Sequence, residues 1–260
     1  MNTIKQYYAI AWIGMSAAVF TACSKSDDEP VTPVDPPGEE VVTGVYTVSD
    51  LAADTSATSS GAATTLYYSL ARNQVVPASQ VQTNNWDIAF TGIYNSSVYV
   101  NNGQSQYSPG YGGPGRGAIA LAMYADIEAQ YYDAAGHRLA SIPVRTLFDQ
   151  AFDRVTTAVA DDAFNGYPSV ELDYFLGTGD GWAWYDFYGV LYPGRADKAH
   201  VAYALPRPLI VRTAKGNYAK VVIYSLYKGA PVDPDRSHKP GYISFKYAIQ
   251  QDGSRNLDIR

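Results

Sequence analysis

The fold of this chain depends most clearly on residues 208–224, PLIVRTAKGNYAKVVIY, and on residues 241–250, GYISFKYAIQ. Both stretches are rich in β-branched and aromatic side chains, which favour strands. Within the first stretch, two strand-like runs flank the segment AKGN at residues 214–217, which is typical of a hairpin turn. The pattern therefore predicts an antiparallel meander that ends at the turn-forming sequence DGS, residues 252–254.

Strand-like segments also precede this meander. Residues 86–90 alternate between apolar and small or polar side chains, as a half-buried strand does. Residues 182–188 are aromatic and strand-like, residues 167–181 have the composition of a loop, and residues 118–123 fit either a strand or a helix. Three further short strands are predicted from their β-branched and aromatic content at residues 45–48, 64–70 and 98–100.

One helix and one additional hairpin complete the prediction. The hairpin joins residues 130–132 to residues 141–144. We find no repeat with a period of about 20–50 residues. The chain is therefore predicted to be all-β and mostly antiparallel, a single domain with one short helix. That helix is expected over residues 146–160, where apolar side chains recur at helical spacing: Leu147, Phe148, Ala151, Phe152, Val155 and Val159.

The N-terminus has the organisation of a bacterial lipoprotein signal peptide. Lys5 is the only charged residue among the first 24, and an apolar run follows at residues 8–20. This run is shorter than the roughly 20 apolar residues of a transmembrane helix. The sequence FTAC at residues 20–23 resembles a lipobox, with Phe20 in place of the usual Leu, and predicts that residues 1–22 are removed and Cys23 is lipidated. The alternative is that Cys23 is an ordinary residue of an apolar segment.

Cys23 is the only cysteine, so no intramolecular disulfide can form and the thiol is best explained as the acyl acceptor of a membrane anchor. Residues 23–42 are rich in proline and acidic residues and are predicted to be a disordered stalk, which leaves residues 43–260 as the β domain. The acidic cluster after Cys23 resembles the surface-export signal of some Gram-negative lipoproteins. A plain solvated linker is the alternative.

Composition and motifs exclude several functions. The formal net charge is −6 and no basic run is present, which argues against nucleic acid as a partner. The 23 tyrosines suit both strands and binding surfaces. The sequence has no serine-nucleophile, zinc-protease or phosphate-loop motif, so we expect no enzymatic activity. Glu171 and Asp173 offer a carboxylate pair for a carbohydrate-active enzyme, the weakest of the functional alternatives.

Several segments, in their order along the chain, resemble the HmuY family of haem-binding bacterial lipoproteins. The resemblance begins near Thr64 and reaches the C-terminus, with poor agreement between Gly92 and Gln150. The segments that carry it are WDIAF at 86–90, FDRVT at 152–156, WY at 184–185, VRTAKGNYAK at 211–220, GYISFKY at 241–247 and DGS at 252–254.

This resemblance implies a single all-β domain that grips haem between projecting loops. It further implies a lipid-anchored outer-membrane protein, displayed at the cell surface, which captures haem as cargo and delivers it to a TonB-dependent receptor. The alternative is an adhesive or structural surface lipoprotein of the same fold, whose aromatic loops bind protein or glycan.

Candidate haem ligands follow from the chemistry of iron, which takes axial ligands from His, Met, Tyr or Cys. His200 is the first candidate, because it lies between the WY segment and the strand at 208–213, where family members often carry histidine. Met123 and His137 are the other candidates. Each has an ordinary interpretation as well, as a surface histidine or a core methionine. No second ligand stands out.

Haem also needs apolar walls and partners for its propionates. Arg195 and Lys198 are candidates for the propionates, although loop cations are commonly just solvated. Four aromatic residues are candidate walls, with packing in a sheet as the alternative: Trp182, Trp184, Tyr185 and Tyr188.

Overall fold

The computed structural model describes residues 38–56, 63–135, 139, 141–173 and 181–260. These residues belong to one compact unit, Pro37–Arg260. Cys23 and His137 lie outside the described residues. Within the described ranges, no helix combines the length and the apolar content needed to cross a bilayer.

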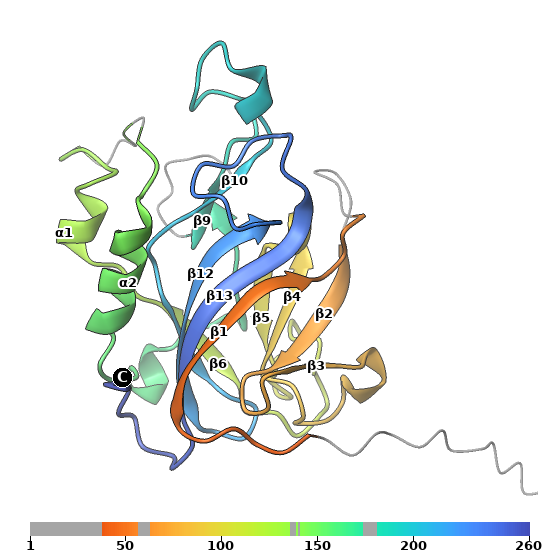
Figure 1. Ribbon diagram of the computed structural model, residues 1–260. Coiled ribbons are helices and arrows are strands. Elements are labelled where there is room, and N and C mark those ends of the chain that lie inside the picture. The colour runs from red at the N-terminus through yellow and green to blue at the C-terminus, as the bar shows by residue number, and fades with distance from the viewer. Residues whose placement is uncertain (1–37, 57–62, 136–138, 140, 174–180) are drawn as a thin grey trace, which may run out of the picture. The chain divides into compact units, whose positions relative to one another are not determined.

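The first sheet contains the predicted meander. β11 (Leu209–Arg212), β12 (Tyr218–Tyr227) and β13 (Pro240–Gln250) are consecutive antiparallel neighbours, so this prediction is confirmed. β1 (Gly44–Ala52) extends the sheet beside β13, and β6 (Ala118–Leu121) extends it beside β11. The order is β1-β13-β12-β11-β6 (Figure 1). The segment at 118–123, which fitted strand or helix, thus begins as a strand.

The second sheet is also antiparallel, with the order β3-β2-β4-β5-β7. Three of its strands fall on segments expected from the sequence, displaced by no more than two residues at either end. In chain order its strands are β2 (Ala63–Ser69), β3 (Gln74–Val76), β4 (Ile88–Gly92), β5 (Ser97–Val100) and β7 (Ser169–Val170).

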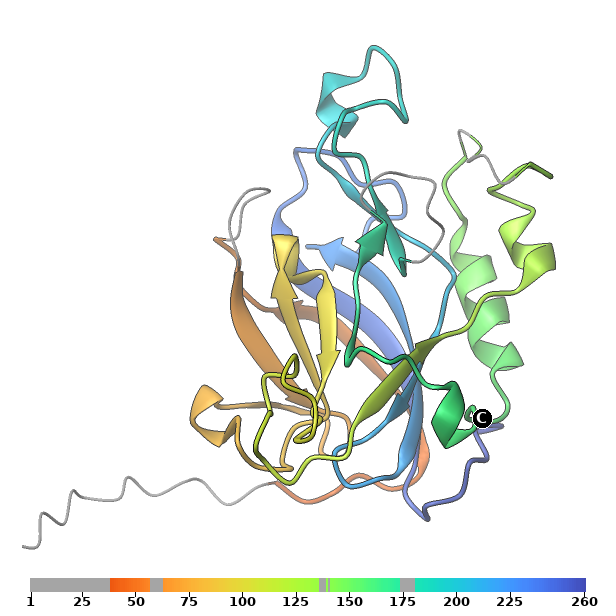
Figure 2. The ribbon, with the colours of Figure 1, turned by 180° about the vertical axis from the view of Figure 1, so that it is seen from behind.

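The two five-stranded sheets face each other across the main hydrophobic core (Figure 2). The ring of Phe90 on β4 lies 5.9 Å from that of Phe245 on β13, measured between centroids. Tyr68 on β2 meets the same Phe245 ring edge-on at 5.4 Å. Burying a side chain of this size contributes about 1.5–3 kcal/mol, so these contacts hold the two sheets together.

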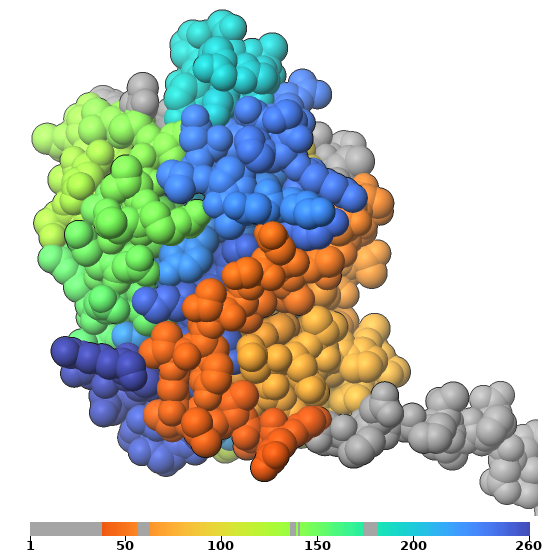
Figure 3. All heavy atoms as spheres, viewed as in Figure 1, coloured from red at the N-terminus to blue at the C-terminus, as the bar shows by residue number. Residues whose placement is uncertain are grey.

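β12 is buried on both faces, because successive side chains of a strand point to opposite sides. Val221 and Ile223 pack into the core between the sheets. Val222 points the other way and packs against Phe148 and Phe152 of α2 (Arg145–Arg154). Figure 1 shows α2 beside β12, and Figure 3 shows β1 crossing the front of the molecule.

The predicted helix at 146–160 is wrong in its C-terminal part. α2 ends at Arg154, and Val155 has extended backbone angles, with φ −77° and ψ 91°. The run VTT at 155–157 is β-branched, which disfavours helix because the side chains lose rotamer freedom. The carbonyl of Val155 instead accepts a hydrogen bond of 2.8 Å from Nζ of the buried Lys220.

The predicted hairpin at 130–144 is also wrong. Neither of its arms forms a strand among the described residues; the short helix α1 (Ala125–Glu128) leads into turns instead. Glu128 faces inward and pairs with Nη2 of Arg207 at 2.6 Å, and Nη1 of Arg207 donates to the carbonyl of Gly181 at 2.6 Å. This buried ion pair holds α1 and the turns after it against the rest of the protein, and no local sequence pattern predicts the pairing.

A small third sheet completes the unit, with the order β10-β9-β8. β9 (Ala183–Tyr185) pairs in parallel with β8 (Leu172–Asp173) and antiparallel with β10 (Ala202–Ala204). The loop expected at 167–181 is wrong in part, because β7 and β8 form within it. Only Val170 and Leu172 alternate as buried apolar residues there, which is too short a pattern to predict a strand. In the described part of the chain, 3₁₀ turns occur at η1 (Ala78–Gln80), η2 (Ile93–Asn95), η3 (Asp161–Ala163) and η4 (Ala196–Lys198).

Candidate ligand site at the projecting loops

The connection between β9 and β10, residues 186–201, projects beyond the sheets at the top of Figure 1. Asp186 anchors its base and is fully buried. Its carboxylate accepts hydrogen bonds from the backbone N–H groups of Val190, at 2.8 Å, and Leu191, at 3.1 Å. A charged acceptor with two backbone donors fixes the start of the loop firmly.

A second loop, residues 228–239, packs against the first. The side chain of Lys198 is only 5% exposed, and Nζ donates to Oδ1 of Asp233 at 2.5 Å and to the carbonyl of Pro234 at 2.9 Å. The backbone N–H of Arg236 also donates to the carbonyl of Asp197 at 2.8 Å. Lys198, a predicted propionate partner, therefore joins the two loops with its ammonium group directed inward.

Arg195, the other predicted propionate partner, lies at the exposed edge of the first loop. Its Nε and Nη2 contact the two carboxylate oxygens of Asp197 at 2.9 and 2.6 Å. This bidentate pair holds the pKa of Asp197 below its usual value, chiefly through the Arg195 hydrogen bonds. The Arg195–Asp197 pair is exposed, and Arg195 therefore remains accessible to a ligand in solvent.

His200 lies where the projecting loop returns to β10. Its backbone is left-handed, with φ 56°, a value uncommon outside glycine and asparagine. The N–H of His200 donates to the carbonyl of Asp186 at 2.8 Å, and its carbonyl accepts from the hydroxyl of Tyr94 at 3.2 Å. Two hydrogen bonds thus hold a conformation that the backbone alone disfavours.

The imidazole of His200 is partly exposed and has one nitrogen committed. Nδ1 lies 3.2 Å from the hydroxyl of Tyr185. Nε2 has no hydrogen-bond partner among the residues that the structure describes. Because Tyr185 engages Nδ1, Nε2 is the ring nitrogen of His200 left to bind a metal.

An exposed aromatic pair, Phe187 and Tyr188, lies beside this imidazole. Phe187 meets it edge-on with ring centroids 5.5 Å apart, and Phe187 is 42% exposed. Tyr188, a predicted wall residue, contacts Phe187 at 5.0 Å and is 70% exposed. The structure therefore brings His200 and Tyr188 together through Phe187, and this arrangement offers an iron ligand beside apolar aromatic surface.

The other three predicted wall residues, Trp182, Trp184 and Tyr185, are buried in the main core and line no open surface. Nε1 of Trp182 donates to the carbonyl of Ser96 at 2.8 Å, and Nε1 of Trp184 donates to the hydroxyl of Tyr132 at 2.6 Å. Their polar atoms are satisfied inside the protein, so they support the loops from below, as the sheet-packing alternative expected.

The hydroxyl groups beneath the site belong to neutral phenols. Burial raises the pKa of Tyr227 well above its usual value, and the Tyr227 oxygen accepts a hydrogen bond of 2.9 Å from the N–H of Ala202. Burial likewise raises the pKa of Tyr203. These phenols add no charge beneath His200, while the buried Asp186 carboxylate at the base of the same loop is satisfied by the N–H groups of Val190 and Leu191.

Met123 lies elsewhere. It follows β6 on the first sheet and is 51% exposed, so it fills no core space as a structural methionine would. No hydrogen bond or ring contact links it to the residues around His200 within the described part of the chain. His137 is outside the described residues. The same described part contains no cluster of three or more His, Cys, Asp or Glu side chains able to hold a metal ion.

Two residues of the site are absent from the sequence prediction, Phe187 and Tyr94. Phe187 had a usable signal, since the pair Phe187-Tyr188 precedes Gly189, where φ is 67° and the chain turns. An aromatic pair just before a turn cannot continue into a sheet core. Tyr94 gave no local signal, because it comes from η2, more than a hundred residues before His200.

The architecture defines an all-β, mostly antiparallel sandwich with projecting loops. No protein-family model matches the chain, and no curated protein matches it. A solved structure of a candidate lipoprotein from Bacteroides fragilis is similar at 13% identity, covering 79% of this chain and 90% of that one, with a TM-score of 0.33. The apo HmuY analog of Tannerella forsythia is similar at 12% identity, covering 84% and 100%, with a TM-score of 0.35.

Proposed function

We propose that the protein is a lipid-anchored surface lipoprotein that captures haem at its projecting loops and delivers it to an outer-membrane receptor. The anchor rests on the lipobox-like sequence that ends at Cys23. Non-covalent capture and release require no bond to be made in the substrate, so the proposal includes no enzymatic activity.

One observation carries the haem proposal: His200 presents Nε2 beside the exposed ring of Phe187 while Tyr185 engages Nδ1. Haem needs an axial ligand for iron and an apolar surface for the porphyrin face, and the imidazole of His200 and the ring of Phe187 offer both at this point. Arg195, exposed in the same loop, supplies a cation for a propionate.

The test is a haemin titration followed by visible spectroscopy in both redox states. The reference protein is the mature chain from residue 23 with Cys23→Ser, which removes the only thiol that could itself bind iron. His200→Asn removes the imidazole while keeping a residue that tolerates the left-handed backbone. His238→Asn is the matched control; His238 is partly exposed in the neighbouring loop, where its Nδ1 lies 2.9 Å from Asp235, and no aromatic ring is stacked near it within the described residues.

We expect a saturable shift of the Soret band in the reference protein and in His238→Asn. In His200→Asn the affinity should fall by about tenfold or more, equivalent to about 1.4 kcal/mol, since the iron loses its ligand. Met123→Leu, tested beside them, should leave the spectrum unchanged. A flat titration of the reference protein would reject haem capture and favour the adhesive alternative, in which Phe187 and Tyr188 contact protein or glycan.

A further inference from the structure

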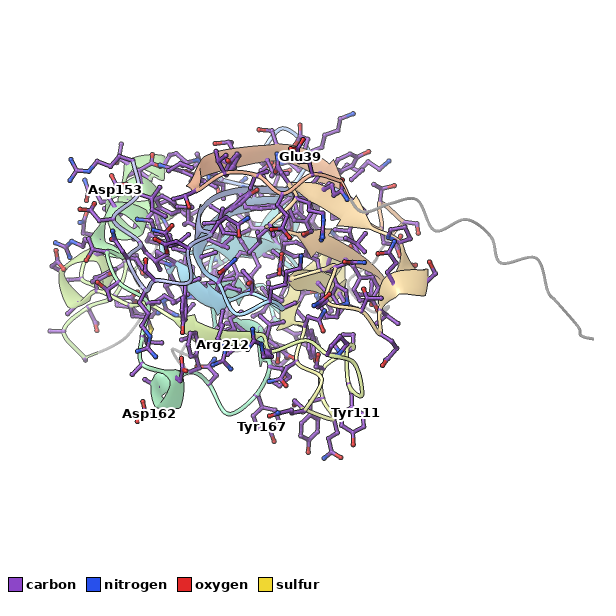
Figure 4. The ribbon with its side chains drawn as sticks, turned by 90° about the horizontal axis from the view of Figure 1, so that it is seen from below. Glu39, Tyr111, Asp153, Asp162, Tyr167 and Arg212 are labelled. Atoms are coloured by element: carbon purple, nitrogen blue, oxygen red, sulfur yellow. The ribbon has the colours of Figure 1, made fainter. Side chains whose placement is uncertain are left out.

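A second concave surface lies at the far end of the sheets from His200. β12 runs between them: Tyr227, at its end, contacts Tyr94 beside His200, and Tyr218, at its start, lines a cavity. A strand rises about 3.3 Å per residue, so this ten-residue strand separates the two places by about 30 Å. Figure 4 shows this lower end, with Arg212 and Tyr167 labelled.

The cavity has a volume of about 310 Å³, at the lower limit of the roughly 300–1,000 Å³ typical of small-molecule sites. Its walls are polar, which suits a hydroxylated or charged ligand better than an apolar one. They come from the loop between β5 and β6, from η3, and from β11, the β11–β12 turn and β12: Asn102, Gln104, Arg116, Asp161, Arg212, Gly216 and Tyr218.

Two guanidinium groups in this wall are held in place and keep unused donors. Nε of Arg212 donates to the carbonyl of Arg116 at 2.8 Å, and Nη2 of Arg116 donates to the carbonyl of Lys215 at 2.5 Å. Each guanidinium carries five N–H donors, so both retain N–H groups with no partner among the described residues. Arginine presents such donors in a planar fork that matches a carboxylate.

The charge balance also favours an anion. Asp161 is the acid of the cavity wall, and it is already surrounded by donors. Its Oδ1 accepts from Tyr218 at 3.1 Å and from Arg255 at 2.9 Å, and its Oδ2 lies 3.4 Å from Nη1 of Arg212. The carboxylate of Asp161 thus pairs with Arg212 and Arg255, and the lining residues Arg116, Arg212 and Asp161 together carry a net positive charge.

Neutral amide donors accompany these charges. Oδ1 of Asn102 accepts from the N–H groups of Gln104, at 2.9 Å, and Ser105, at 3.2 Å. Neither the Asn102 amide NH₂ nor the Gln104 side chain has a hydrogen-bond partner within the described ranges, so both amides keep free donors at the cavity. Such amides suit the hydroxyl groups of a sugar.

An exposed aromatic pair comes from the same two chain segments that supply part of the cavity wall. Tyr107 and Tyr167 are 55% and 61% exposed, with ring centroids 5.0 Å apart. Tyr107 comes from the loop that supplies Asn102 and Gln104, and Tyr167 follows η3, which supplies Asp161. Tyrosine offers an apolar face and a polar tip at low entropic cost, as binding surfaces require.

From these elements we infer that the lower cavity binds a glycan through an acidic sugar, with its carboxylate on Arg116 and Arg212 and its ring stacked on Tyr107 and Tyr167. A bare anion would make no stacking contact with the tyrosine pair, and an apolar ligand would leave the free N–H groups of the arginines without an acceptor. The site is independent of haem capture and lies on the part of the molecule remote from the projecting loops.

The experiment measures binding of 3′-sialyllactose and trigalacturonate to the reference protein by titration calorimetry and by saturation-transfer NMR. Lactose is the neutral arm, and inorganic sulfate is the arm for an anion alone. The variants are Arg116→Gln and the double variant Tyr107→Ala/Tyr167→Ala, all at exposed positions. Tyr111→Ala is the matched control, since Tyr111 is 54% exposed in the same loop and makes no ring contact with Tyr167.

We expect an acidic oligosaccharide to bind, lactose to bind at least about tenfold more weakly, and both variants to weaken binding by about tenfold. Sulfate binding as tight as the sugar, equal binding of lactose, or no binding at millimolar concentration would each overturn the inference. Equal loss in Tyr111→Ala would overturn the assignment of stacking to the Tyr107–Tyr167 pair.

Discussion

The two ends of β12 are built in different ways. At the projecting loops, a layer of buried aromatic side chains supports His200 from below; Trp184 there is fully buried and meets Tyr131 and Tyr132 edge-on, each at 5.6 Å. At the lower end, the backbone itself is compacted around one buried amide, Asn101. The loop end therefore depends on large buried side chains, whereas the lower end depends on glycines whose missing side chains let the backbone segments approach closely.

Asn101 organises the lower end. Its Nδ2 donates to the carbonyls of Thr83, at 2.8 Å, and Trp86, at 2.9 Å, and its own carbonyl accepts from the N–H of Gly117 at 2.7 Å. A Cβ on Gly115 would lie 2.2 Å from Oδ1 of Asn101. The glycine-rich segment 110–117 therefore packs closely around Asn101 beside the lower cavity. We predict that different substitutions destabilise the two ends of β12.

The largest effect is expected for Trp184→Ala, which removes the centre of the aromatic layer. Large-to-small changes of this kind cost about 3–5 kcal/mol because they leave a cavity. The free energy of unfolding, measured by urea denaturation, checks the value, with Tyr188→Ala as the exposed control at under about 0.5 kcal/mol. A loss below about 1 kcal/mol would mean that this layer does not support the loop end.

Gly117→Ala tests the lower end in the opposite way. The added Cβ would lie 2.6 Å from the backbone oxygen of Asn101, so the backbone must shift. Overpacking of this kind costs about 1–3 kcal/mol. Gly166→Ala is the matched control, because its Cβ would meet no atom within 4 Å, and its urea midpoint should stay the same or rise. Equal midpoints for the two variants would contradict the close-packed frame.

A smaller effect is expected at His200. His200→Val places a β-branched residue at φ 56°, and a left-handed backbone costs such a residue about 1–2 kcal/mol. His200→Asn should cost clearly less, since asparagine tolerates this region. The two urea midpoints separate backbone strain from loss of the imidazole; identical midpoints would show that the loop relaxes out of the left-handed conformation.

The smallest expected effect is a pH dependence of stability, and it involves only Asp235 in the projecting loops. Hydrogen bonds from Ser237, followed by the contact with His238, lower the pKa of Asp235 to about 2 from its usual 3.8. A carboxylate with a lowered folded-state pKa stabilises the protein above the unfolded value and loses that contribution as pH falls through the folded value. The difference in urea midpoint between the reference protein and Asp235→Ala should therefore be constant above about pH 5 and shrink toward pH 2. A difference that grows with acid would reverse the assigned sign.

The sequence by itself determined the features that depend on residues close together in the chain. The meander at 208–250 was predictable, since β-branched runs, their spacing and the AKGN turn act within a few residues of one another. The start of the helix was equally predictable from its apolar spacing, whereas its end at Arg154 combines the local β-branched run at 155–157 with a contact between Val155 and Lys220 of a distant strand. The all-β class followed from the same patterns.

Tertiary structure alone decided the sites. His200 could be chosen from the sequence, but its partners Tyr94 and Tyr185 meet it only through folding, and three predicted wall residues proved to be core. The lower cavity joins Arg116, Asp161 and Arg212 from segments about 50 to 100 residues apart. The alternation of side chains along a strand predicts which face of the sheet each side chain occupies. Contacts between remote segments depend on how the sheets pack against each other, and local sequence patterns do not encode that packing.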